Sequence, residues 1–206
     1  MNRGSRKKIG VALLALASLL LSGCSNPSDA ASFKSGKITN KELQASVSTI
    51  LDERIKFNTT PQEGFSGDAL TRNQLEFHIF SALLTKAAQE RKVVALPGEI
   101  SARRAEVLQN VGGEDQLSVA LVNAGIASID LDEYLALIVL QDKLRAVIAP
   151  NATDDGQVVA ALQKMLTETA VSEKLVVNPR YGTWNVQTNR VEPADPTEGA
   201  LPAAKQ

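Results

Sequence analysis

The sequence is poor in the residues that build most catalytic and metal sites. Among 206 residues it has one cysteine, Cys24, and one histidine, His78. A single cysteine excludes a disulfide within the chain, and a single histidine excludes a metal site built on two histidines. His78 lies near the apolar face of an expected helix. This position predicts a packed or half-exposed side chain without a catalytic role.

Recognisable catalytic motifs are also missing. The chain has no G-x-G-x-x-G, no G-x-x-x-x-G-K-[ST] and no G-x-S-x-G. Its acidic clusters, Asp130/Asp132/Glu133 and Asp154/Asp155, stand where helices are expected to begin, and the helix dipole stabilises negative charge there. We therefore expect no catalytic residue, no metal and no cofactor, and hence no enzymatic activity.

The chain lacks an excess of positive charge. It has 22 Lys and Arg residues against 23 Asp and Glu. Four of the basic residues lie in the first 23 positions, which hold no acidic residue, so the remainder has 18 basic against 23 acidic groups, a net charge near −5. Because a surface that binds nucleic acid needs a basic excess, we expect no nucleic-acid partner.

The N-terminal segment has the pattern of an exported protein. A basic stretch precedes the apolar run IGVALLALASLLL at 9–21. That run matches the hydrophobic region of a signal peptide and is shorter than the roughly 20 residues of an ordinary membrane span. The next residues, Leu-Ser-Gly-Cys, resemble the lipobox of bacterial lipoproteins. The resemblance implies cleavage between Gly23 and Cys24 and a diacylglyceryl group on the Cys24 thiol.

Two acyl chains give stable membrane attachment, so the resemblance places the mature protein at the cell membrane, lipid-anchored on the extracytoplasmic face. Two alternatives remain open: a secretory signal peptide with a coincidental cysteine, and an uncleaved helix that anchors the chain. Both still export the rest of the chain.

The remaining chain reads as one mainly helical domain. The expected organisation is a signal peptide over 1–23, a tether over 24–31, a domain over 32–188 and a disordered tail over 189–206. Capping pairs and apolar periodicity predict helices. The pairs are Thr39/Glu42, Thr71/Gln74 and Asp130/Glu133, with Thr153 before the last helix, and the helices are expected near 40–55, 72–92, 98–110, 114–123, 131–148 and 154–173.

Short strand-like segments lie at both ends of this domain. The first is SFKSGKIT, with a Ser-Gly turn in its middle, and the second is LVVNPRYGTWNV. Because neither is stable alone, we expect Phe33 and its neighbours to pair with the late segment in a small antiparallel sheet. The pairing should bury Trp184 substantially. The late partners are Val176, Val177, Thr183, Trp184 and Val186.

The order of these segments resembles a known family. After the lipobox come SFKSGKITNKEL, LEFHIFSALLTKAAQERKV, LPGEISARRAEV, GGEDQLSVALVNAGIASIDLDEYLALIVLQDKL and VVNPRYGTWN. This order resembles the N-terminal chaperone domain of the SurA and PrsA group of extracytoplasmic peptidyl-prolyl isomerases and chaperones. The resemblance implies a helical domain that holds unfolded exported polypeptides in an apolar groove, without covalent chemistry.

One departure separates the chain from the isomerases of that group. Those members carry a parvulin domain between the helical part and the closing strand, and a domain needs on the order of 100 residues. Here about 30 residues separate Ile148 from Asn178, and their pattern is helical. The isomerase domain is therefore missing.

Aromatic side chains are the candidates for peptide contact. The expected residues are Phe57, Phe65, Phe77, Phe80 and Tyr134. For Phe77 and Phe80, ordinary core packing is the stronger alternative, whereas Phe65 stands in a Gly-rich loop and is harder to explain as core.

The expected function is that of a membrane-anchored holdase for unfolded or assembling exported proteins. The alternative is a structural or adaptor lipoprotein that docks one dedicated partner in the cell envelope. The sequence does not indicate an oligomeric state.

Overall fold

The computed structural model describes residues 28–193. The predicted lipidation site at Cys24 and the residues after 193 lie outside this range. The helices are α1 (Asn40–Phe57), α2 (Gly67–Glu90), α3 (Pro97–Val111), α4 (Glu114–Asn123), the 3-10 turn η1 (Ser128–Asp130), α5 (Leu131–Ile148) and α6 (Asp155–Ser172). The strands are β1 (Asp29–Ser32), β2 (Lys37–Thr39), β3 (Val176–Val177), β4 (Thr183–Asn185) and β5 (Arg190–Glu192). The predicted class, mainly helical with a small antiparallel sheet, is confirmed.

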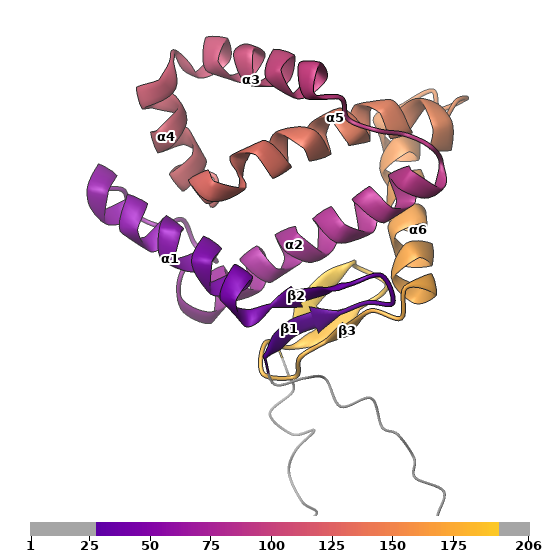
Figure 1. The fold of residues 1–206 in the computed structure, drawn as a ribbon, viewed down its shortest axis with the longest axis horizontal. Helices are drawn as coiled ribbons and strands as arrows, with labels where there is room; N and C mark the ends of the chain where they lie inside the picture. The colour runs from indigo at the N-terminus through magenta and orange to yellow at the C-terminus, as the bar shows by residue number, and fades with distance from the viewer. Residues whose placement is uncertain (1–27, 194–206) are drawn as a thin grey trace, which may run out of the picture.

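Helix α2 lies at the centre of the molecule, as its apolar circumference predicts. It packs against α1, α5, α6 and the sheet. Figure 1 shows α2 crossing the middle of the view, with α1 at the left, α6 at the right and the strands beneath. The main core takes its largest side chains from α1, α2 and α5, including Leu43, Ile50, Leu75, Ile79, Leu83, Leu84 and Leu144.

A second, smaller core joins α3, α4 and α5, which form an open triangle above α2 in Figure 1. Its buried members are Leu117, Leu121, Leu131 and Leu135. Helix α3 contributes no buried residue. Every buried residue that the structure describes lies between Asp29 and Val191, so the chain from Ser25 to Gln206, here called the leaderless chain, keeps all described packing.

The sheet joins the two ends of the domain. Strand β1 lies between β2 and β3, antiparallel to both, with Ala31 opposite Ile38 on one side and Val177 on the other. The predicted pairing of early and late segments is therefore confirmed for β1 and β3. It is wrong for Thr183 and Trp184, because β4 pairs with β5 instead, and for Val186, which follows β4 without belonging to a strand. Trp184 nevertheless packs against the main core and is partly buried there, as expected, and Phe33 follows β1 without belonging to it.

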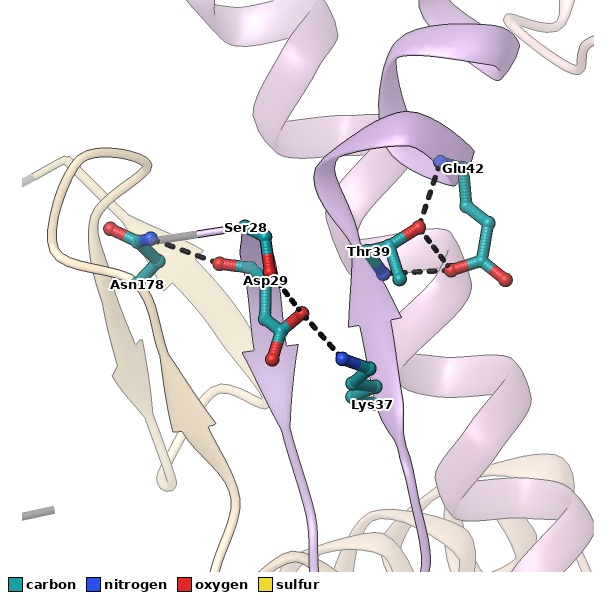
Figure 2. Close-up of polar contacts among 6 residues, drawn as sticks. All are labelled: Ser28, Asp29, Lys37, Thr39, Glu42 and Asn178. Atoms are coloured by element: carbon teal, nitrogen blue, oxygen red, sulfur yellow. Dashed lines mark hydrogen bonds and ion pairs between the residues drawn. The ribbon is translucent and has the colours of Figure 1, made fainter. Parts of the chain in front are cut away.

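Polar contacts tie the late segment to β1 and fix the start of α1 (Figure 2). Asn178 Nδ2 donates to the carbonyl oxygen of Asp29 at 2.9 Å. The Asp29 carboxylate pairs with Lys37 Nζ at 3.0 Å. The capping box predicted at Thr39 is confirmed, because Glu42 N donates to Thr39 Oγ1 at 3.1 Å and Thr39 N donates to Glu42 Oε2 at 2.7 Å. The hydrogen bonds that Thr39 donates to the Glu42 carboxylate, first the one from its backbone N and then the one from Oγ1 at 2.7 Å, lower the pKa of Glu42.

Two predicted domain boundaries are wrong. Strand β1 begins at Asp29, inside the expected tether, because its residues find partners in β2 and β3. Strand β5 lies inside the expected disordered tail, where Val191 is buried against the main core.

Three predicted helix caps are also wrong, although α5 begins at Leu131 as expected. Helix α2 begins at Gly67, before the expected cap at Thr71, and its Gln74 is buried. The Asp130 side chain makes no capping bond to α5. Asp154, not Thr153, caps α6 by accepting a hydrogen bond from Gln157 N at 2.9 Å.

Helix α1 buries only part of its apolar side chains. Leu43, Val47 and Ile50 are buried, but Leu51 is 45% exposed and Ile55 81% exposed. These two residues lie one turn apart, so they form an exposed apolar pair on α1.

Candidate functional site

A cavity of about 420 Å³ lies between α2 and the segment that runs from the end of α4 into α5. One face of α2 supplies Asn73, Glu76, Phe77 and Phe80, whose spacing places them on successive turns. The opposite wall comes from Ile126, Ala127, Asp130 and Tyr134. A volume of this size lies within the usual range of ligand sites in proteins.

The structure brings four of the five predicted contact residues together. Phe65, Phe77, Phe80 and Tyr134 all line this cavity, and all four are half-buried. Phe57 does not join them. It is the last residue of α1, where the Lys56 ammonium lies 4.9 Å from the centre of its ring.

Phe65 closes one end of the cavity. Its ring lies so close to Gly125 that a Cβ built at Gly125 would stand 2.5 Å from Phe65 Cε1. Gly125 has φ +69°, a conformation that favours glycine. The buried Gln74 side chain fixes the same residue, because its Nε2 donates to the Gly125 carbonyl oxygen at 2.9 Å. The loop before α2 is thereby docked on the end of α4.

The turn between β4 and β5 forms another wall, with Thr188, Asn189 and Arg190. Glu76 holds this turn against α2, since its Oε1 accepts a hydrogen bond from Val191 N at 2.9 Å and its Oε2 lies 3.5 Å from Arg190 Nη1. Burial raises the pKa of Glu76, and the contacts with Val191 and Arg190 oppose that rise. The sequence did not predict this wall, because residues 189–206 were expected to form a disordered tail. The alternation in Arg190–Glu192 was a weak sign of a strand, but it could not show where the strand packs.

Asp130 is the polar residue of the cavity with unmet bonding capacity. It is 8% exposed, and its Oδ2 atom is buried without a hydrogen-bond partner among residues 28–193. Its predicted partner in a capping box, Glu133, instead accepts a hydrogen bond from Ser81 Oγ on α2.

A second cavity, of about 490 Å³, lies between the β1–β2 turn and α2 and is more polar. His78 lines it and is half-buried, as expected, and its Nε2 lies 2.9 Å from Ser46 Oγ. A serine beside a histidine is the starting arrangement for nucleophilic catalysis. Ser46 is 1% exposed, however, so a substrate carbonyl cannot approach its hydroxyl in this structure. The pair joins α1 to α2.

Within residues 28–193, no group of three or more His, Cys, Asp and Glu side chains is arranged to hold a metal ion. Over the same described range, no helix combines the length and the apolar character needed to cross a membrane.

Comparisons with known proteins do not place the chain in a family. No protein-family model matches it, and neither the curated proteins nor the solved structures contain a significant match.

Proposed function

We propose that this protein is a lipid-anchored, extracytoplasmic holdase that binds unfolded or assembling exported polypeptides without catalysis. The observation that supports this most is the cavity between α2 and α5, where Phe65, Phe77, Phe80 and Tyr134 meet. Aromatic rings bury large apolar areas and so dominate the energetics of binding surfaces. Half-buried rings around an open volume have apolar surface left for a client side chain.

The anchor and the sheet would lie close to each other. Strand β1 begins at Asp29, five positions after Cys24. An extended chain spans at most about 3.6 Å per residue, so the sheet would stand within about 18 Å of a lipidated Cys24. Clients would then be held near the membrane surface.

The test is suppression of aggregation by the leaderless chain. Two unrelated proteins, one reduced and one chemically denatured, are diluted into buffer with and without it, and light scattering is followed. A holdase slows the aggregation of both. Phe65→Ala should weaken that protection and Phe57→Ala should not, because Phe57 is a half-buried phenylalanine outside the cavity. Protection of neither client would contradict the proposal.

The second candidate function is an adaptor that docks one dedicated cell-envelope partner. The exposed apolar side chains of Leu51 and Ile55 favour it, because they lie one turn apart on α1 and form an exposed apolar pair. The double variant Leu51→Lys/Ile55→Lys separates the two functions. It leaves protection of both clients unchanged if the cavity binds them, and an adaptor would lose its partner.

A further inference from the structure

The Asp130 carboxylate has no donor in the described part of the chain. It lines the cavity, is 8% exposed, and forms no hydrogen bond or ion pair with residues 28–193. A buried carboxylate oxygen without a donor gives up its hydrogen bonds to water and gains none in return. The dipole at the start of α5 offsets part of that cost, but no backbone amide of α5 bonds to the side chain.

The other charges of the cavity leave Asp130 uncompensated. Glu76 is the second carboxylate, and Arg190 is the one basic residue among those that line the cavity. Arg190 lies 3.5 Å from Glu76, and its side chain is 69% exposed. The wall therefore carries one more negative than positive charge, and the excess lies at Asp130.

Aromatic rings line the same cavity as this carboxylate. Tyr134 follows Asp130 by one turn of α5, and Phe77 and Phe80 line the wall that α2 contributes. Such rings attract a cation over their faces and cover the aliphatic stem of a lysine or an arginine. A purely apolar side chain would use the rings but would leave Asp130 without a donor.

We infer that the cavity takes a lysine or arginine side chain, flanked by apolar residues, from the bound polypeptide. This inference rests on the proposed function, because it names the kind of segment that the same cavity binds. The ammonium or guanidinium group donates to Asp130, and the neighbouring apolar residues lie on Phe77 and Phe80. Segments that combine one basic residue with aromatic or aliphatic neighbours are preferred over equally apolar neutral ones.

The test uses three labelled peptides, Gly-Ser-Leu-Phe-X-Phe-Leu-Ser-Gly, in which X is lysine, norleucine or glutamate. Norleucine keeps the stem of lysine without its charge. Binding to the leaderless chain is measured by fluorescence anisotropy for the wild type and for Asp130→Asn, which keeps the shape of the side chain. Asp132→Asn is the matched control, because Asp132 lies two residues further along, has an 88% exposed side chain and does not line the cavity.

The lysine peptide should bind about tenfold more tightly than the norleucine peptide, the size expected for one charge-assisted hydrogen bond, and the glutamate peptide most weakly. In Asp130→Asn the affinity for the lysine peptide should fall to within about twofold of the affinity for the norleucine peptide, which should not change. Asp132→Asn should keep the tenfold preference for the lysine peptide.

Equal binding of lysine and norleucine to the wild type would overturn the inference while the proposed function stands. Equal weakening of all three peptides by Asp130→Asn would overturn it too, since the role of Asp130 would then be structural. If no peptide binds and neither client is protected from aggregation, the proposed function fails and the inference fails with it.

Discussion

The Phe65 ring rests on the backbone of Gly125, a residue 60 positions further along the chain and held in a left-handed conformation with φ +69°. The contact joins the loop before α2 to the end of α4. It sets the position of one aromatic wall of the cavity, and only a residue without a Cβ leaves room for the ring.

Gly125→Ala should displace that ring. The new Cβ would stand 2.5 Å from Phe65 Cε1, and the left-handed backbone costs a non-glycine residue roughly 1 to 2 kcal/mol. We expect a similar loss in the free energy of unfolding and weaker protection of clients. Gly112→Ala is the control, because Gly112 has φ +95° but no aromatic ring against it. It should lose stability and keep client protection, and equal loss of protection in both variants would argue against the role of the ring.

Gly182→Ala should destabilise the end of the domain. A Cβ at Gly182 would stand 2.0 Å from the carbonyl oxygen of Glu192, and φ is +135°. Because the obstacle is backbone, β4 and β5 must move apart, and we expect a loss of about 2 to 4 kcal/mol in urea unfolding. Gly98→Ala meets open space and should change stability by less than about 0.5 kcal/mol. An equally small effect at Gly182 would contradict the described β4–β5 hairpin.

The predicted capping pairs show how far the sequence could predict the fold. Thr39 and Glu42 form the capping box that their spacing predicts, because both lie at the surface with no competing partner. The same spacing fails at Thr71/Gln74 and Asp130/Glu133. There the second residue bonds to a distant one instead, Gln74 to Gly125 and Glu133 to Ser81. A local pattern carries no information about such tertiary partners.

The candidate site was predictable to a similar degree. Phe77 and Phe80 share a face of α2, so their common direction follows from helical spacing. The contribution of Arg190 could not be foreseen in the same way, because it depends on Glu76 reaching a backbone amide 115 positions away.

The pH dependence of stability should include a contribution from Glu76. Burial raises its pKa above the ordinary value of 4.5, so the folded state holds the proton more strongly than the unfolded state. The stabilisation from protonation is complete below about 4.5 and is lost as the pH rises through the raised pKa.

Urea unfolding of the wild type and of Glu76→Gln at pH 5 and pH 7 measures this contribution. The stability of the wild type relative to Glu76→Gln should be greater at pH 5 than at pH 7. Glutamine keeps an acceptor for Val191 N without the charge. If the stability of the wild type relative to Glu76→Gln is independent of pH, or grows with pH, burial does not destabilise the charged Glu76 carboxylate.

Cys24→Ala should release the chain from the membrane. If Cys24 carries two acyl chains, the wild type sediments with membranes and incorporates labelled palmitate, since two chains give stable attachment. The variant should incorporate no label, and Ser25→Ala, the adjacent control, should behave like the wild type. A membrane-bound Cys24→Ala chain would instead favour an uncleaved N-terminal helix as the anchor.

The most direct test of the central claim is to locate a bound client. A photoreactive benzoylphenylalanine replaces Phe65 in one leaderless chain and Phe57 in another, and each is irradiated with an unfolded client. Cross-linking from position 65 and little from position 57 is the predicted result, because only Phe65 lines the cavity. Equal cross-linking from both positions, or none from position 65, would contradict binding in this cavity.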